Sequence, residues 1–189
     1  MLEFLGIGLL GVALLAVLAI VALFVILTYN HLVTLRNRVR NAWAQIDVQL
    51  KRRYDLIPNL IETVKGYTKH ERETLTDITK YRAQLVTGGV EEKAKANNML
   101  SQALKSLFAV AENYPQLKAN ENFKMLQEEL AGTENKIAYI RTAYNDSVLE
   151  INTACDTFPS NVIAGMLGFK HEAYFETAAA EKEPVKVKF

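Results

Sequence analysis

Histidine and cysteine are the side chains of this sequence best suited to catalysis or metal binding, and their spacing argues against both. The three histidines, His31, His70 and His171, are far apart along the chain. The stretch "HERET" lacks the second histidine of a zinc-protease helix. Because no nucleophile, base and orienting residue come together, we predict no metal, no cofactor and no enzymatic activity.

Other reactive groups are also isolated. "TGGVEEK" lacks the second spaced glycine and the Lys-Ser/Thr pair of a phosphate loop. The single cysteine, Cys155, lies in a helical apolar pattern, which favours a buried, inert thiol over a nucleophile. Acidic pairs such as Glu128-Glu129 fall on the outer face of that helix and are expected to be solvated.

The basic cluster Lys51-Arg52-Arg53 allows three interpretations: contact with anionic lipid, with nucleic acid or with a protein partner. Three residues fall short of a lipid-binding cluster. Asp55 and Glu62 are close enough on a helix to pair with some of these charges. We therefore expect a solvated, internally paired surface and no nucleic-acid partner.

Arg53 differs from its neighbours because it interrupts an apolar row. A buried arginine needs a carboxylate partner, since an unpaired buried charge is strongly destabilising. Five acidic residues are candidates for that partner: Asp55, Glu121, Glu128, Glu134 and Asp146.

A long apolar run precedes all these groups. Residues 4–27 carry neither charge nor polar side chain, and a helix of this length reaches about 36 Å, enough to cross a membrane. A cleaved signal peptide would need a basic start, a shorter apolar run and a cleavage site. Here the only charged residue before the run is acidic, Glu3, and the run is too long. We predict a retained anchor over residues 1–28.

The flanking charges predict the orientation of the anchor. Arg36, Arg38 and Arg40 follow the apolar run, whereas no Lys or Arg precedes it. The positive-inside rule then places the N-terminus outside and the remainder in the cytoplasm. We therefore expect a single-pass protein that is located in the cell membrane.

The remainder reads as helix with few interruptions, without a strand pattern. Rows through Leu32, Val39, Ile46 and Leu60 and through Trp43, Leu50, Ile57 and Val64 form one stripe, which we expect to continue as helix up to "TGG" at residues 87–89. A second helix follows to about Asn113. A third carries a seam from Phe123 to Ala154. "FPSN" ends it, with Ser160 or Asn161 capping a short successor.

These elements define an all-α protein: a transmembrane helix followed by a long antiparallel, up-and-down bundle over residues 29–178. Residues 179–189 are expected to form a flexible tail. Pro58 leaves two arrangements open, a kinked continuous helix or a hairpin at "DLIPN". We favour the kinked helix because the stripe stays in phase across Pro58.

Three blocks of the sequence resemble the LemA family of bacterial proteins: residues 29–71, 111–152 and 158–176. The resemblance implies one helix in the bacterial inner membrane, followed by a cytoplasmic helical bundle. It implies no established enzymatic activity. Relatives have been connected with membrane organisation. The resemblance also marks structural motif residues: Trp43, Arg53, Asp55, Pro58, Asn59, Pro115, Asn135, Tyr144, Asn145, Pro159, Phe169, Tyr174 and Phe175.

Two functions fit these observations. The first is a non-enzymatic scaffold that self-associates and organises membrane, with the lipid bilayer and further copies as partners. The alternative is an adaptor or regulator of a membrane protease or signalling protein. Small residues at Ala13, Ala16, Ala19 and Ala22 favour helix contacts in the membrane, although ordinary alanine-rich sequence gives the same pattern. The uncharged block at residues 162–169 must cover its apolar face with the bundle core, the membrane interface or a neighbouring copy.

Overall fold

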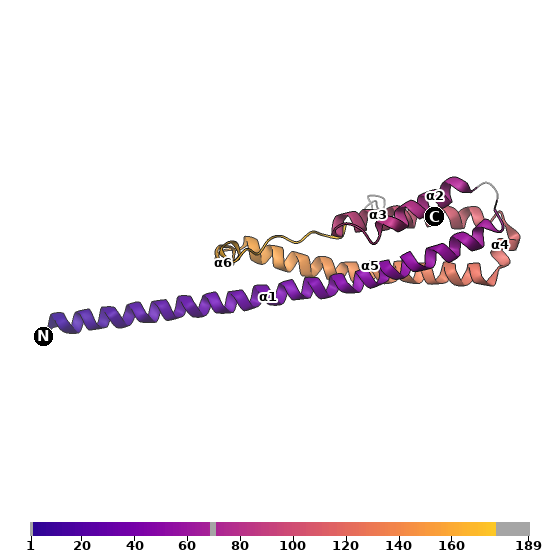
Figure 1. The fold of residues 1–189 in the computed structure, drawn as a ribbon. Coiled ribbons are helices and arrows are strands. Elements are labelled where there is room, and N and C mark those ends of the chain that lie inside the picture. The colour runs from indigo at the N-terminus through magenta and orange to yellow at the C-terminus, as the bar shows by residue number, and fades with distance from the viewer. Residues whose placement is uncertain (1, 69–70, 177–189) are drawn as a thin grey trace, which may run out of the picture. The chain divides into compact units, whose positions relative to one another are not determined.

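The computed structural model describes residues 2–68 and 71–176, with side chains from Leu10 onward, and every regular element in these ranges is a helix. The predicted all-α bundle after a long apolar helix is confirmed (Figure 1). His70 and the predicted tail at 179–189 lie outside the described residues. The helices are α1 (Leu2–Lys65), α2 (Arg72–Gln84), α3 (Val90–Ala111), α4 (Pro115–Ala119), α5 (Glu121–Asp156) and α6 (Ser160–Met166).

Helix α1 is continuous across Pro58, so the predicted single helix is confirmed and the hairpin is wrong. A kink at Pro58 stays a prediction. The stripe that favoured this interpretation is buried, with Leu50, Ile57 and Leu60 inaccessible to solvent. Burial on both sides of the proline supports one helix, because a hairpin would turn the second half away from the first half's partners.

The helical region expected up to "TGG" is interrupted once, because α1 ends at Lys65 and α2 begins at Arg72. The carbonyl oxygen of Val64 accepts from the N–H groups of both Tyr67 (2.9 Å) and Thr68 (3.0 Å), which closes the last turn. Gly66 disfavours continuation, since glycine loses more backbone freedom in a helix than other residues. Gly88 does adopt the left-handed conformation expected of a helix-ending glycine, with φ of 82°.

The chain divides into two compact units, each built from segments that are distant in the sequence. Unit 1 comprises Met1–Arg40 and Ser147–Glu172, and unit 2 comprises Asn41–Asp146 and Ala173–Phe189. Helices α1 and α5 each contribute to both units. The predicted domain boundaries at residues 28 and 178 stay predictions.

Unit 2 is an antiparallel bundle in which the second part of α1, then α2, α3 and the first part of α5, alternate in direction. Short connections require this alternation. The polar Thr133 is buried in this unit and its hydroxyl donates to the Leu130 carbonyl at 2.8 Å. The bundle core includes Ile46, Leu50, Ile57, Leu60, Ile78, Leu85, Leu100, Leu104, Leu107, Phe123, Leu126, Leu130 and Ile137.

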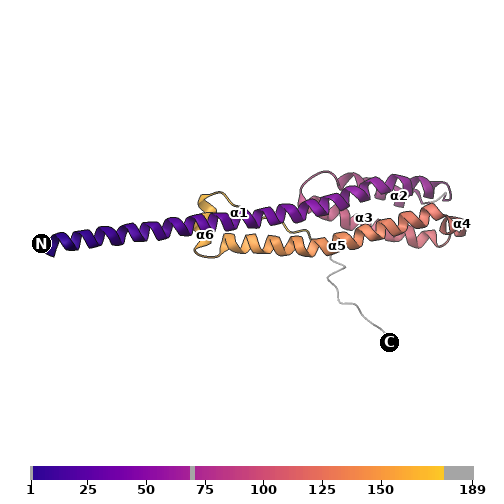
Figure 2. The same cartoon turned by 90° about the horizontal axis from the view of Figure 1, so that it is seen from below.

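Unit 1 contains the apolar part of α1, the last part of α5, helix α6 and the chain that follows it to Glu172. Every residue from 10 to 27 is exposed, and burial starts abruptly at Thr28. Val148 and Ile151 of α5 and Ile163 of α6 are buried in the same unit. Helix α6 lies across α1 rather than along it: it is seen nearly end-on in Figure 1 and lengthwise in Figure 2.

The junction of α5 and α6 corrects the predicted cap. Pro159 occupies the N-cap position of α6, with no side-chain capping bond. The Ser160 hydroxyl instead donates to the carbonyl oxygens of Ala154 (2.7 Å) and Thr157 (2.8 Å), at the end of α5. The Ala154 carbonyl belongs to the last turn of α5, and the Thr157 carbonyl follows that helix and also accepts from the Asn161 N–H at 2.9 Å. The serine hydroxyl therefore bonds the end of the preceding helix and the junction instead of capping α6.

Candidate functional site

Arg53 is the most deeply buried charged residue that the structure describes, with 1 % of its surface exposed. Its Nη1 donates to Asn97 Oδ1 (2.6 Å), to Ser101 Oγ (3.1 Å) and to the Glu134 carboxylate. Glu134 is one of the five partners expected from the sequence, so that prediction is confirmed. The arginine thereby joins α1, α3 and α5 within unit 2.

The electrostatics of this cluster explain why the charge is tolerated. Burial lowers the pKa of the Arg53 guanidinium below its ordinary value, and the charge and hydrogen bond of Glu134 act in the opposite direction. Arginine remains protonated at neutral pH. The cluster is therefore a buried ion pair with polar support from Asn97 and Ser101.

A hollow of about 180 Å³ adjoins the arginine. Ser101, Glu134 and the predicted motif residue Asn135 line it, together with the apolar side chains of Leu104, Phe108 and Leu130. Ligand sites for drug-sized molecules are larger, about 300–1,000 Å³. The hollow is therefore smaller than such sites, and the polar contacts of Arg53 beside it join three helices of unit 2.

The two basic residues that precede Arg53 in the sequence, Lys51 and Arg52, also form ion pairs. Lys51 contacts Asp55, the predicted motif residue one helical turn away, and Arg52 contacts Glu129 of α5. Both pairs are about half exposed. Such exposed pairs stabilise a fold weakly, by about 0–1 kcal/mol.

An arginine that was not predicted from the sequence replaces the hydrogen bond that Pro58 cannot make. A proline at position 58 cannot donate to the carbonyl oxygen of Tyr54, one turn earlier. Arg82 Nε of α2 donates to that oxygen at 2.7 Å, and its guanidinium carbon lies 3.8 Å from the centre of the Tyr54 ring. The neighbouring motif residue Asn59 is exposed, and its carbonyl accepts from Thr63 Oγ1 at 2.8 Å.

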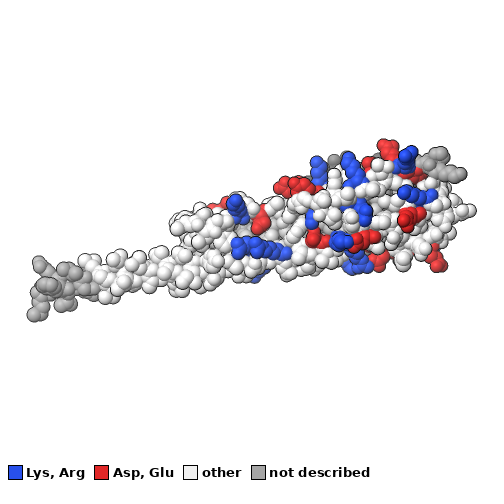
Figure 3. Space-filling view, in the orientation of Figure 1, with Lys and Arg blue, Asp and Glu red and all other residues white. Residues whose placement is uncertain are grey.

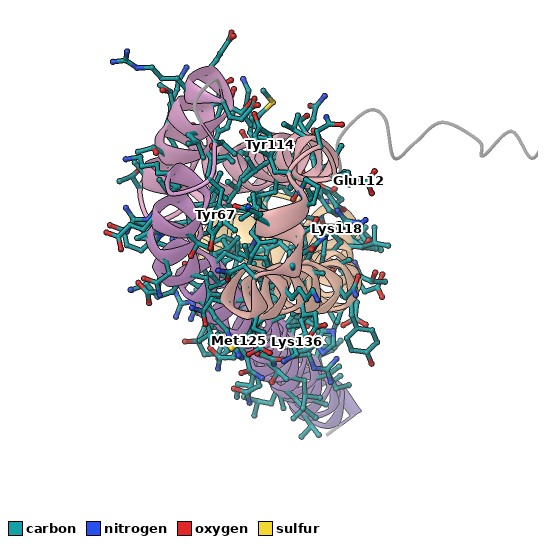
Figure 4. The ribbon with its side chains drawn as sticks, turned by 90° about the vertical axis from the view of Figure 1, so that its right-hand side faces the viewer. Tyr67, Glu112, Tyr114, Lys118, Met125 and Lys136 are labelled. Atoms are coloured by element: carbon teal, nitrogen blue, oxygen red, sulfur yellow. The ribbon has the colours of Figure 1, made fainter. Side chains whose placement is uncertain are left out.

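Pro115 begins the short helix α4 at one end of unit 2, where its fixed φ suits a first helical position. Two tyrosines lie at this end (Figure 4). Tyr114 donates to the Glu71 carboxylate at 2.9 Å, which raises the pKa of the phenol, and Tyr67 accepts from Asn120 Nδ2 at 3.0 Å. These bonds join the connection after α1 to the two ends of α4.

Four predicted motif residues meet where unit 2 receives the C-terminal segment. Trp43 lies with its ring 5.7 Å from that of Tyr144 and 6.2 Å from that of Phe175, which is fully buried. Asn145 Oδ1 accepts from the Phe175 N–H (2.9 Å) and Nδ2 donates to the Phe175 carbonyl (3.1 Å). The Tyr144 hydroxyl donates to the carbonyl of Ala173 at 2.8 Å. Tyr174, the fifth predicted residue of this region, is 38 % exposed.

Unit 1 contains a second amide that holds extended chain in the same manner. Asn152 Oδ1 accepts from the Glu172 N–H (2.9 Å), and its Nδ2 donates to the Glu172 carbonyl (3.0 Å). Asn152 was not among the predicted residues. Its position seven residues after Asn145 placed it on the same helical face, and that spacing was the available signal.

Two further motif residues occur near α6 in unit 1. Phe169 packs edge-on against Tyr29, with ring centres 6.2 Å apart, and the Arg36 guanidinium lies 5.1 Å from the Phe169 ring. Pro159 follows a cis peptide bond at the N-cap of α6. Gly168 ends this helix with φ of 72°, and the Phe169 N–H donates to the Ala164 carbonyl at 3.0 Å.

Among residues 2–68 and 71–176, no three His, Cys, Asp or Glu side chains are grouped so as to hold a metal ion. Cys155 is half-buried, and burial followed by the charges of Asp156 and Glu172 raises the pKa of its thiol. A raised pKa reduces the thiolate fraction and so the reactivity. The absence of enzymatic activity stays a prediction.

One helix in the described part of the chain, α1, is long and apolar enough to cross a membrane. Charged side chains gather on the folded remainder, and the surface of the apolar segment is white in Figure 3. Together with a bundle whose buried polar contacts join its own helices, these features define a membrane-associated helical protein. A family model described as the LemA family matches residues 42–189, and the chain belongs to that family.

Curated relatives agree with this assignment. The chain is 30% identical over 162 residues to Protein LemA of Metamycoplasma hominis, covering 82% of this chain and 72% of the relative. It is 24% identical over 205 residues to Magnetosome protein MamQ 2 of Paramagnetospirillum magneticum, covering 94% and 75%. Magnetosome protein MamQ of Magnetospirillum gryphiswaldense is 24% identical over 199 residues, covering 90% and 73%.

Proposed function

We propose that this protein is a membrane-anchored helical scaffold that self-associates in the bilayer and organises membrane or membrane proteins. One observation carries the proposal. Every residue from 10 to 27 is exposed in the single chain, and the same helix continues without a break into the buried stripe of the bundle. Such a contiguous apolar surface requires a nonaqueous partner.

Lateral association is supported by the small residues within the apolar segment. Ala13, Ala16, Ala19 and Ala22 recur every third residue and are exposed. Small side chains allow membrane helices to approach closely. An anchor also confines copies to a plane and so raises their effective concentration, which makes weak contacts sufficient.

The proposed orientation places the folded part in the cytoplasm. Arg36 and Arg38 follow the apolar segment within a few helical turns, in line with the positive-inside rule. Tyr139, 82 % exposed, offers a labelling position in unit 2. In a Cys155→Ser background, Tyr139→Cys should react with an impermeant thiol reagent only after the cells are opened. Labelling in intact cells would contradict the orientation.

Self-association is tested on the full chain in nanodiscs and in several mild detergents. Light scattering should give a homogeneous homo-oligomer. Ala16→Leu with Ala19→Leu should reduce its mass, because larger side chains separate the helices. The matched control, Val17→Leu with Val21→Leu, adds bulk elsewhere in the segment and should leave the mass unchanged.

A monomer in all of these media would contradict the scaffold. A monomer that captures one membrane protein in a crosslinking experiment would favour the adaptor instead. An oligomer that tolerates both double substitutions would keep self-association and move the contact outside the alanine row.

A further inference from the structure

Helix α6 presents an apolar face that no described side chain of unit 1 covers. Phe158, just before the helix, is 78 % exposed, Val162 is 53 % exposed and Met166 is 80 % exposed. Val162 and Met166 are four residues apart within α6, so they form one apolar stripe on the helix, and Phe158 adds an exposed apolar side chain just before it. Leu167, at the C-cap of α6, is also 49 % exposed.

The opposite face of α6 belongs to the core of unit 1, since Ile163 and Ala164 are buried. The block at residues 162–169 therefore divides between two of the environments expected from the sequence. Its buried half satisfies the first, the bundle's own core. No charged residue occurs from Ser160 to Phe169, and after Ser160 and Asn161 no polar side chain occurs either. The exposed half of the block is therefore apolar.

The position of this face within unit 1 indicates what covers it. Phe169, immediately after the stripe, packs against Tyr29. Tyr29 lies about 3 Å along the helix axis from Leu27, where the exposed apolar run ends. Helix α6 therefore lies at the level at which α1 would leave the hydrocarbon, and it crosses α1 as a helix lying in the membrane plane would (Figures 1 and 2).

The surrounding side chains suit a membrane surface. Tyr29, at the end of the span, is of the type enriched where membrane meets water. Arg36 stacks on Phe169 and exposed Lys170 follows it, which places cationic groups beside the apolar stripe. Asp156 and His171 pair with each other at 2.9 Å on the exposed surface of the same unit.

We propose that the exposed face of α6 inserts into the boundary between headgroups and acyl chains of the same bilayer that α1 crosses. Apolar faces of interfacial helices bury to about 5–10 Å at this boundary. A second copy is the weaker occupant, because Phe169 packs against Tyr29 just after the apolar run of α1, where lipid is the nearest apolar medium. The inference depends on the membrane anchoring proposed above but not on self-association.

Depth-dependent quenching on the full chain tests this inference. In a Cys155→Ser background, Met166→Cys carries a small fluorophore, and the protein is reconstituted into vesicles of phosphatidylcholine and phosphatidylglycerol. We expect loss of fluorescence with lipids that carry a nitroxide near the headgroup, and shielding from aqueous iodide. Because Met166 is exposed, the label leaves the fold intact, which circular dichroism verifies.

Two matched positions make the result interpretable. Leu149→Cys on α5 is 56 % exposed in the same unit, about 10 Å before the end of that helix at Asp156, and should show the reverse pattern. Leu18→Cys in the apolar segment is 55 % exposed and should be quenched by deep nitroxides.

Iodide access at position 166, with position 18 quenched by lipid, would overturn the α6 inference alone. Shielding of position 166 from both quenchers would also overturn it, since protein would then cover the face. Failure of lipid quenching at position 18 would overturn the anchor itself, and the inference with it.

Discussion

The Nε–H of Arg82 donates to the carbonyl oxygen of Tyr54 at 2.7 Å, and Tyr54 is the residue whose carbonyl Pro58 cannot serve. The proline removes one hydrogen bond from α1, and a neighbouring helix replaces it. The same guanidinium stacks on the Tyr54 ring. The hydrogen bond that α1 lacks at Pro58 is thereby replaced by a specific contact between α1 and α2.

This relationship predicts coupling between positions 58 and 82. Arg82→Met should lower the free energy of unfolding by about 1–3 kcal/mol, because it leaves a partly buried carbonyl unsatisfied. In a Pro58→Ala background the loss should be smaller, since the new N–H can serve Tyr54. Urea unfolding measures both. Lys80→Met on the same helix is the control, and equal losses in the two backgrounds would refute the coupling.

The Arg53 cluster predicts an asymmetric response to substitution. Glu134→Leu strands a buried guanidinium and should cost about 3–5 kcal/mol of unfolding free energy. Arg53→Met should cost less, because the Glu134 side chain is 32% exposed and can be hydrated. The double variant should recover much of the loss. Arg52→Met, which breaks an exposed pair, should change stability by about 0–1 kcal/mol. An additive double variant would argue against a coupled pair.

Asn145 is predicted to hold the C-terminal segment in place. Asn145→Ala removes both bonds to Phe175, so hydrogen exchange at the Phe175 amide and proteolysis near it should accelerate. The expected loss of unfolding free energy is about 1–3 kcal/mol. Asn145→Asp keeps the acceptor for the Phe175 N–H and should restore part of the protection. Asn59→Ala, at an exposed position, is the control; the same acceleration there would indicate a general loss of stability.

Cys155 is predicted to react slowly with alkylating reagents at neutral pH. Its pKa is raised by burial and then by Asp156 and Glu172, so less thiolate is present than in a free cysteine. Asp156→Asn should lower this pKa and increase the alkylation rate, with the largest gain below the shifted pKa. Glu150→Gln, another acidic residue of α5, serves as the control. An unchanged rate profile in Asp156→Asn would exclude the electrostatic contribution.

The helices were predictable from the sequence because burial repeats with the helical period. The rows through Leu50, Ile57 and Leu60 gave both the stripe and its continuity across Pro58. Arg53 was identified for the same reason: a charge in an apolar row is conspicuous. Its partner could be limited to five carboxylates but not chosen, since the choice depends on how α5 packs against α1.

The contacts that sequence reasoning missed are those that join distant segments through common residue types. Arg82 donates to the Tyr54 carbonyl without any periodic signal in either residue. Asn152 binds the backbone of Glu172, and its seven-residue spacing from Asn145 says nothing about that partner. Ser160 was assigned to the wrong helix because a hydroxyl at a junction can serve either end. Helix termini are set by such local competition, and side-chain periodicity carries little information about it.

The abrupt start of burial at Thr28, directly after Leu27, has a consequence for the reach of the protein. In the proposed topology no flexible tether separates the bilayer from the folded chain, so the domain cannot sweep a volume of cytoplasm as a domain on a long linker does. The distance from the membrane at which the domain can bind a partner is therefore limited by the length of the folded chain. Partners that bind unit 1 must therefore come to the membrane surface themselves, which selects for other membrane-bound proteins and for lipid.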